Sequence, residues 1–248
     1  MLTLKNIYQS FPTSSEPILN GIDLHLNNGD YCILLGSNGS GKSTLFKTIL
    51  GEYTVDNGNI FIDNEDFTHK NRNHTIAAIV QEVNKGTVLE LTLLENIVLS
   101  LMRIRKAKFA FYRHYEEEAV AQIKAFNLGL EKTLHQPLFR LSGGQRQIIA
   151  TLMAINSKPK ILLCDEHTSA LDPRTQQYLM HYTNNAIKEN NITTIMITHK
   201  LEDAIQYGNR LIMLQQGKIV FDVAGKEKQT LTIAKLLDLF LNEVKHEC

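Results

Sequence analysis

The 248-residue sequence predicts an α/β fold with a mainly parallel sheet, an antiparallel β subdomain and an inserted helical subdomain. After residue 158, apolar runs of strand length alternate with helical patterns, which implies parallel strands. Two runs near the N-terminus alternate apolar and polar residues, and only helical spacing is found between 87 and 157. We therefore expect a single domain over residues 1–248. Its α/β core comprises residues 1–86 and 158–248, and residues 87–157 form the inserted helical subdomain.

The N-terminal part of the chain is expected to supply strands and one helix. Leu2–Ile7 and Leu19–Leu26 have strand patterns, and the apolar residues of the second share one face, as in an antiparallel pair that covers a core. Tyr31–Leu35 is a short apolar run typical of a buried strand, and Lys42–Leu50 has helical spacing that ends at Gly51. Further strands are expected at Asn59–Ile62 and Thr75–Val80.

The middle of the chain is expected to be helical. Leu93–Leu101 carries apolar residues at helical spacing, and a charged helix follows at about Tyr115–Phe126. A third helix, Gly144–Ile155, has one apolar face, and Lys158 and Pro159 end it.

Strands and helices alternate again in the C-terminal part. Asp172 and Pro173 make a good helix start, because the carboxylate can cap the first turn and proline fits the first helical position. The expected strands are Lys160–Asp165, Ile192–Thr198, Arg210–Gln215 and Lys218–Asp222, and the expected helices are Pro173–Glu189, Leu201–Tyr207 and an amphipathic Ile233–Val244.

Residues 36–44 fit the phosphate-binding loop pattern G-x-x-x-x-G-K-[ST]. A strand precedes this loop and a helix follows it, so the backbone N–H groups and the helix N-terminus can surround phosphate oxygens. A glycine-rich turn that matches the pattern by chance is the alternative, and this context disfavours it. Lys42 would reach the β- and γ-phosphates, and the Ser43 hydroxyl would bind Mg²⁺. The expected nucleotide contacts are Gly36, Ser37, Asn38, Gly39, Ser40, Gly41, Lys42, Ser43 and Thr44.

The composition narrows the class of partner. Lys plus Arg and Asp plus Glu each number 26, so no general basic surface indicates nucleic acid, and we expect no nucleic-acid partner.

Cys32 and Cys164 lie in apolar runs and Cys248 ends the sequence, a spacing that suits neither zinc nor a disulfide framework. We expect no leader and no membrane span, because charged and amide residues interrupt Val88–Ile104, the best candidate. A partner would then supply any spanning helices.

A second phosphate-related element follows at Ile161–Asp165, an apolar strand that ends in a carboxylate. This arrangement holds Mg²⁺ opposite Ser43 in phosphate-loop enzymes. Glu166 comes next and can polarise a water molecule for attack on the γ-phosphate, so we expect it to be the general base. The alternative is an ordinary acidic pair at a strand end.

The pentapeptide Leu141–Gln145, LSGGQ, stands at the start of a long helix. Together with the phosphate loop and Ile161–Glu166, it resembles the nucleotide-binding subunit of the ATP-binding cassette (ABC) family. The resemblance implies a phosphate-loop ATPase core and a head-to-tail dimer with two ATP molecules at its interface. In that dimer the pentapeptide caps the γ-phosphate held by the opposite subunit. The residues implied are Ser142, Gly143, Gly144 and Gln145; a glycine-rich N-cap of a core helix is the alternative.

The resemblance also assigns roles near the base and the metal. Phe11 matches the aromatic residue that stacks on adenine; Tyr8 is a weaker candidate, and core packing is the alternative for both. Gln81, at a strand end, matches the glutamine that touches Mg²⁺ or the attacking water and senses the coupled partner. An exposed strand-end glutamine without function is the alternative.

Two more matches lie in the C-terminal part. His199 follows an apolar strand and matches the histidine that contacts the γ-phosphate and orients the water and Glu166. Asp172 matches the loop that communicates across the dimer, and it can also be the helix cap. His167 stands where many ABC subunits carry proline, which makes it a poor second candidate for the catalytic histidine.

The segments Asp165–Pro173, Gly217–Val223 and Leu231–Phe240 are similar to a bacterial subgroup of ABC subunits associated with binding-protein-dependent uptake of tryptophan, tyrosine or related amino acids. The resemblance implies an ATPase that uses ATP and Mg²⁺ at the cytoplasmic face of the bacterial inner (plasma) membrane, as a peripheral subunit. Its implied partners are a second identical or similar cassette, integral membrane permease subunits, and indirectly an extracytoplasmic substrate-binding protein. An ABC exporter subunit and a soluble, non-transport ABC ATPase acting on a macromolecule are the alternatives. A small-molecule kinase would leave Leu141–Gln145 without a role.

Overall fold

The computed structural model describes residues 1–12, 16–72, 75–80, 85–102, 112–124, 126, 128–169 and 171–244. Its first sheet is four-stranded and antiparallel, in the order β2-β1-β4-β5. The strands are β1 (Leu2–Gln9), β2 (Leu19–Leu26), β4 (Asn57–Ile62) and β5 (Glu65–Asp66). The expected antiparallel pair near the N-terminus is thus present, with the apolar residues of β2 buried and Asp23 and His25 exposed.

The second sheet has six strands in the order β10-β9-β3-β8-β7-β6. All neighbours are parallel except β10, which pairs antiparallel with β9. The strands are β3 (Tyr31–Leu35), β6 (Ile76–Ile79), β7 (Ile161–Asp165), β8 (Thr193–Ile197), β9 (Arg210–Gln215) and β10 (Lys218–Ala224). Every residue of β3 and β8 is buried, as expected for central strands of a sheet covered on both faces.

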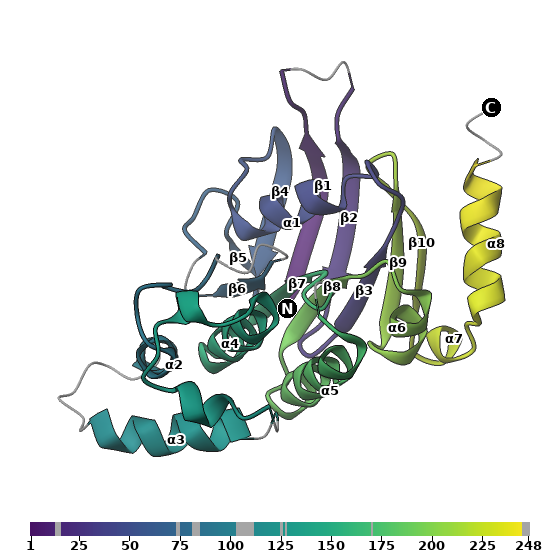
Figure 1. Cartoon of the computed structure of the whole chain (residues 1–248). Helices are drawn as coiled ribbons and strands as arrows, with labels where there is room; N and C mark the ends of the chain where they lie inside the picture. Colours follow the sequence, from purple (N-terminus) through teal and green to yellow (C-terminus); the bar gives the residue numbers. More distant parts are fainter. Residues whose placement is uncertain are drawn as a thin grey trace.

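The helices cover both faces of this parallel sheet and form a third layer beside it (Figure 1). Their bounds are α1 (Lys42–Leu50), α2 (Leu93–Met102), α3 (Tyr112–Lys124), α4 (Gly143–Asn156), α5 (Pro173–Glu189), α6 (Leu201–Gln206), α7 (Gly225–Gln229) and α8 (Ile233–Val244). Two short 3-10 helices lie at Leu130–Thr133 and Leu138–Arg140. The fold is therefore an α/β core with an antiparallel sheet and a helical layer, as the sequence predicts.

The core has three apolar clusters that follow these layers. In the first, Leu45 and Ile49 of α1 pack between the two sheets. In the second, helices α5, α6 and α8 pack on the opposite face of the parallel sheet, with Ile187, Ala204 and Leu236 almost fully buried. Burial of apolar surface on both faces holds the parallel sheet in place, and with it the strand ends from which the loops of the site begin.

The third cluster belongs to the helical layer. Side chains of α2, α3 and α4 pack together there, and Leu179 of α5 joins them. The layer, teal in Figure 1, thus attaches to the core through α4 and α5. Its division from the core at residues 87 and 157 stays a prediction.

The structure differs from the sequence-based elements in small ways. The two-residue β5 and the short α7 were not expected, because neither is long enough to show a period. The charged helix begins at Tyr112 and ends at Lys124, earlier than the predicted 115–126. An isolated bridge joins Thr92 to Pro137 in the region where no strand pattern was seen. Within the described residues, none of the helices combines the length and the apolar character that crossing a bilayer requires.

Candidate active site

The loop between β3 and α1 has the backbone that its glycines permit. Gly36, Gly39 and Gly41 have φ values of 151°, 84° and 104°, which residues with a side chain rarely adopt. A Cβ atom on Gly36 would lie 2.3 Å from the Leu214 carbonyl oxygen and 2.7 Å from Ser40 Oγ. Only glycine therefore fits at the first position of the loop, against the end of β9.

The Lys42 side chain lies inside this loop. Its Nζ donates hydrogen bonds to the carbonyl oxygens of Gly36 and Ser37, each at 2.8 Å. Loss of hydration lowers the pKa of Lys42, while the nearby carboxylates of Glu166 and Asp165 act in the opposite direction. The loop thus holds a cationic group at its centre, facing two acidic residues.

Those two residues lie at the carboxyl end of β7. Burial, followed by repulsion from Glu166, raises the pKa of Asp165, and the Lys42 ammonium partly offsets this. Glu166 has a φ of 44°, in the left-handed region, and its backbone N–H donates to the Ile197 carbonyl oxygen at 3.2 Å. A glutamate in this conformation is unusual and is found most often where function or tight packing requires it.

His199 lies next to Glu166. Its Nε2 is 2.6 Å from Glu166 Oε1. The two residues follow β8 and β7, which are parallel neighbours, so their side chains emerge at the same edge of the sheet. A contact at this distance can hold both groups in fixed orientations.

Most of the predicted residues of the phosphate loop and the strand ends line one pocket of about 340 Å³. Its lining residues are Phe11, Ile18, Asn38, Gly39, Gly41, Lys42, Ser43, Thr44, Asp165, Glu166, Ile197 and His199. The fold therefore brings together oxygen donors, a lysine and a Glu–His pair from three distant parts of the chain. Gly36, Ser37 and Ser40 belong to the same loop without lining this pocket.

The structure distinguishes the two aromatic candidates. Phe11 lines the pocket and its ring makes an edge contact with Tyr53, at 5.1 Å between centroids and 77° between planes. Tyr8 is not among the lining residues; its hydroxyl lies against Gly21, where a Cβ would approach it to 3.0 Å. Phe11 is thus the one of the two aromatic candidates that lines the pocket.

The LSGGQ segment lies elsewhere in the chain, and none of its residues lines this pocket. Ser142 caps α4 in a capping box: its Oγ accepts from the Gln145 N–H at 3.2 Å, and its own N–H donates to Gln145 Oε1 at 2.9 Å. A Cβ on Gly143 would meet no atom within 4 Å, whereas one on Gly144 would lie 2.9 Å from Leu171 Cδ2. The helix start at Gly143 therefore faces open space.

Three further candidates have different outcomes. Asp172 caps α5, because its carboxylate accepts a hydrogen bond from the Thr175 N–H at 3.1 Å. The structure thus confirms the helix cap, and the role across a dimer stays a prediction. Gln81 lies outside the described residues. His167 is buried, does not line the pocket and has a pKa lowered to about 4 by loss of hydration, so it is no rival to His199.

Two basic residues that join separate parts of the chain were not found by sequence reasoning. Arg72 is buried and donates to the carbonyl oxygens of Thr48 and Ile49, which end the helix of the phosphate loop. Lys200, next to His199, donates to Gln176 Oε1 in α5. No motif or spacing connects these partners, because the contacts depend on how the elements pack.

Comparison with known proteins places the chain in a family. The sequence family described as ABC transporter matches residues 19–169. The chain belongs to that family. ABC ATP-binding proteins are ATPases, and the chain is accordingly the ATP-hydrolysing component of a transporter.

Individual relatives agree with this assignment. The chain is 37% identical to a tyrosine transport ATP-binding protein of Clostridioides difficile, over 97% of this chain and 98% of that one. It is 32% identical to a spermidine/putrescine import ATP-binding protein of Aggregatibacter actinomycetemcomitans, over 92% of this chain but 59% of the relative. The long relative thus has a part that this chain does not match.

Solved structures are similar over most of the fold. A dimeric ATP-binding cassette in a post-hydrolysis state with ADP and Pi superposes with a TM-score of 0.79 at 27% identity, covering 90% of this chain and 98% of that one. A nucleotide-free cassette superposes with a TM-score of 0.73 at 25% identity, covering 96% and 95%. The first of these solved cassettes is therefore a dimer that holds the products of ATP hydrolysis.

Proposed function

We propose that this ABC ATPase energises the import of amino acids or similar small solutes through a separate membrane permease. The observation that carries the catalytic part is the 2.6 Å contact between Glu166 and His199 in the pocket that also contains Lys42 and Asp165. Import is supported by relatives named for tyrosine transport and for spermidine/putrescine import. The solute class follows the relative that matches nearly the whole chain.

In this proposal the pocket binds ATP. Phe11 stacks on the adenine, and the loop of residues 36–44 surrounds the phosphates with backbone N–H groups and the Lys42 ammonium. Glu166 takes a proton from the attacking water, and His199, held against it, fixes the orientation of the carboxylate and contacts the γ-phosphate. Gln81 acts at the water or the metal.

The donor set fits Mg²⁺. The Ser43 hydroxyl and the Asp165 carboxylate both line the pocket, and hard oxygen donors are the ligands that Mg²⁺ prefers. Mg²⁺ is usually held by one or two carboxylates together with substrate phosphates and water, so a larger acidic cluster is not required. Bound Mg²⁺ would neutralise charge on the phosphate oxygens during transfer to water.

The second half of the site comes from another cassette. Ser142, Gly143 and Gly144 do not line the ATP pocket of their own chain, and the helix start at Gly143 is open. In a head-to-tail dimer these groups and Gln145 would cap the γ-phosphate bound by the opposite subunit, with Asp172 at the same interface. The dimeric structures of similar cassettes support this arrangement.

A separate groove of about 320 Å³ is suited to receive a helix of the permease. It lies between the edge strand β6, α2 and α4, and its lining includes Ala78, Leu99, Ala150 and Met153. The Leu99 side chain is 46% exposed, so the groove offers apolar surface to a partner. The chain would then sit at the cytoplasmic face of the inner membrane, peripheral to the permease.

Purification from native membranes tests the proposal. The tagged chain is isolated in mild detergent from its own cells, and the proteins that accompany it are identified by mass spectrometry. An integral membrane protein in stoichiometric amount, together with an extracytoplasmic binding protein, is the expected result. A membrane partner without any binding protein would contradict import, and cytosolic partners alone would contradict transport.

A further inference from the structure

The turn that carries His199 is closed by its two neighbours in the chain. This turn follows β8 and precedes α6, and the Lys200 backbone N–H donates to Thr198 Oγ1 at 3.1 Å. A hydrogen bond from an N–H to the threonine hydroxyl two residues earlier is typical of a tight turn. His199 therefore lies within a closed turn, and a contact that holds Lys200 also constrains the position of His199.

The Lys200 side chain extends to the start of α5. Its Nζ donates to Gln176 Oε1 at 2.5 Å. Gln176 is 9% exposed, and its backbone N–H donates to the Asp172 carbonyl oxygen at 2.9 Å, which closes the first turn of the helix. The contact between Lys200 and Gln176 therefore joins the turn of His199 to the first turn of α5.

Lys200 also has an acidic neighbour in α6. Burial raises the pKa of the Asp203 carboxyl, and the Lys200 ammonium opposes this shift. Asp203 lies in the first turn of the helix that directly follows Lys200. Of these two interactions, only the one with Gln176 connects the turn of His199 to a helix that is distant in sequence.

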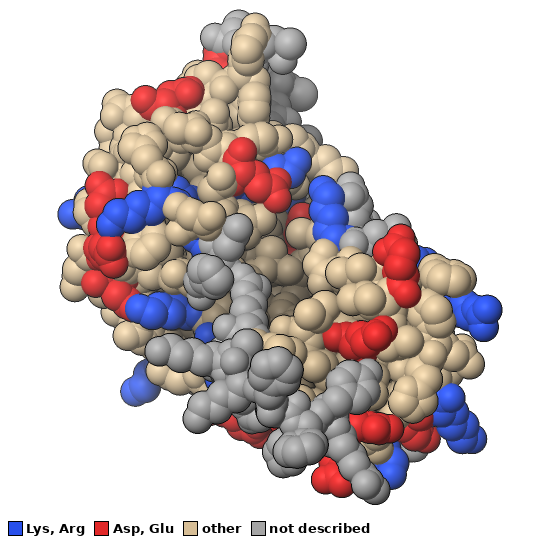
Figure 2. Space-filling model, turned by 90° about the vertical axis from the view of Figure 1, so that its left-hand side faces the viewer, with Lys and Arg blue, Asp and Glu red and all other residues tan. Residues whose placement is uncertain are grey.

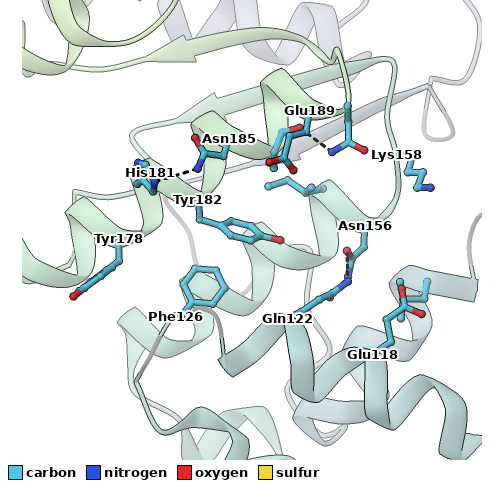
Figure 3. A pocket seen from close by; sticks show the side chains of 14 residues that line it. Glu118, Gln122, Phe126, Asn156, Lys158, Tyr178, His181, Tyr182, Asn185 and Glu189 are labelled. Atoms are coloured by element: carbon cyan, nitrogen blue, oxygen red, sulfur yellow. Dashed lines mark hydrogen bonds between the residues drawn. The ribbon is translucent and has the colours of Figure 1, made fainter.

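Beyond Gln176, α5 packs against the helical layer. Leu179, about one turn further along the helix, is fully buried in the apolar cluster of that layer. The rings of Tyr182 and Phe126 lie 4.7 Å apart between centroids, and Figure 3 shows the two side chains next to each other. Because α5 also packs on the parallel sheet, it lies between that sheet and the helical layer. The position of Gln176 therefore depends on the packing of both.

We propose that Gln176 is a positioning residue for ATP hydrolysis, which acts on His199 through Lys200. This rests on the proposed role of His199 beside Glu166. With the contact intact, the turn holds the His199 ring against the Glu166 carboxylate, where Nε2 and Oε1 lie 2.6 Å apart. Without it, the turn gains freedom and the ring leaves this orientation more often, so the hydrolytic step slows while ATP binding persists.

Steady-state ATPase kinetics of the full chain test this contact. Gln176→Met keeps the length of the side chain but removes its oxygen acceptor, so we expect kcat to fall by at least about threefold with the KM for ATP unchanged. Gln176→Glu keeps an acceptor for the ammonium group, and its kcat should stay near the wild-type value. Gln177→Met, the same change as the first at the exposed neighbouring position of α5, is the matched control and should change neither parameter.

A double-mutant cycle separates this contact from other effects of Lys200, including its effect on Asp203. Lys200→Met should lower kcat at least as much as Gln176→Met does. Adding Gln176→Met to Lys200→Met should cause no further loss, because the hydrogen bond is already broken. Fully additive losses, an unchanged kcat in Gln176→Met, or an equal loss in Gln176→Glu would each overturn the proposal.

The His199 ring gives a readout that does not depend on turnover. In proton–carbon NMR spectra, with the ring signal assigned through His199→Gln, Gln176→Met should shift the signal of His199 and Gln177→Met should not. An unshifted signal in Gln176→Met would overturn the proposal. Wild-type turnover by His199→Gln would overturn the proposed role of His199 and this proposal with it. Loss of turnover by His199→Gln, together with an unchanged kcat in Gln176→Met, would overturn only the role of Gln176.

Discussion

At the scale of single residues, the candidate active site depends on a contact made from two adjacent strands. Glu166 leaves β7 in a left-handed conformation and meets His199, which follows β8. The conformation costs energy, of the order of 1–3 kcal/mol for residues in such regions, and packing of the strand ends must compensate. The orientation of the proposed base is therefore part of the fold.

Glu166→Gln tests the proposed base. The amide keeps the size of the side chain but cannot accept a proton, so we expect ATP binding to persist and turnover to fall by at least about 100-fold. ATP-dependent dimers should accumulate, which size-exclusion chromatography with light scattering would detect. Lys42→Ala is the complementary variant and should lose ATP binding itself. Undiminished hydrolysis by Glu166→Gln would exclude it as the base.

The sequence predicts much of this residue-scale arrangement. Lys42, Asp165 and His199 belong to motifs whose order along the chain indicates one nucleotide site. The structure brings all three residues to one pocket. Their catalytic roles stay predictions. The left-handed backbone at Glu166 and the carbonyl contacts of Lys42 could not be predicted, because motif spacing carries no information on dihedral angles or on which carbonyl oxygens face inward.

At the scale of secondary-structure elements, the N-terminus of α4 combines two properties in one residue. Ser142 caps the helix through Gln145, and in the proposed dimer it also faces a phosphate. Helix N-termini attract anions and benefit from a side-chain acceptor. The helix cap requires a side-chain acceptor at this position, whereas a contact with phosphate disfavours a negative charge. Substitutions can therefore separate the effect on stability from the effect on catalysis.

Ser142→Ala and Ser142→Asp make that separation. The alanine variant loses the cap, so we expect its free energy of unfolding to fall by about 1 kcal/mol. Aspartate can cap the helix, so stability should stay near the wild-type value, while its charge repels the γ-phosphate and abolishes turnover. Urea denaturation and ATPase assays give the two readouts. Wild-type turnover in the aspartate variant would contradict the dimer site.

The end of α1 depends on Arg72. Its guanidinium donates to carbonyl oxygens of Thr48, Ile49, Phe67 and Thr68. We expect Arg72→Met to lower the free energy of unfolding by at least about 3 kcal/mol, because charged hydrogen bonds are lost and carbonyl groups stay buried without partners. Denaturation midpoints measure this, with Lys70→Met, at a more exposed neighbouring cation, as the control. Equal losses in both variants would contradict the role of Arg72.

Helix and strand limits were largely accessible from the sequence where a physical signal marks them. Gly51 ends α1 in a left-handed conformation and Asp172 caps α5, both as their residue types predict. The short β5 and α7 lack such signals, since tertiary contacts alone fix them. The hydrogen bonds from Arg72 to the end of α1 also depend on packing between segments that are distant in sequence.

At the scale of the whole molecule, the central strands of the parallel sheet are buried on both faces. Cys32 and Cys164 are 0% exposed, and burial raises the pKa of each thiol. On one outer face, acidic and basic side chains are interspersed, with no broad field of one sign among the described residues (Figure 2). Buried thiols in the interior thus contrast with an outer face that carries charged side chains of both signs.

The two buried thiols should resist alkylation. In the folded chain at mildly alkaline pH we expect no modification of Cys32 or Cys164 by iodoacetamide, because neither solvent nor thiolate is present at the sulfur. Both should react fully in concentrated guanidinium chloride. Peptide mapping by mass spectrometry resolves each position, and rapid native labelling of either would show that the central sheet opens.

The strand order of the parallel sheet has a consequence for how the chain folds. β6 and β7 are hydrogen-bonded neighbours, yet the chain between them includes α2, α3 and α4. Closing so long a loop costs entropy before the pairing can compensate for it, which slows folding. Packing of α2 on α4 before the strands pair would shorten the effective loop. We therefore expect the refolding rate to depend on the stability of the helical layer, more than on any residue that touches ATP.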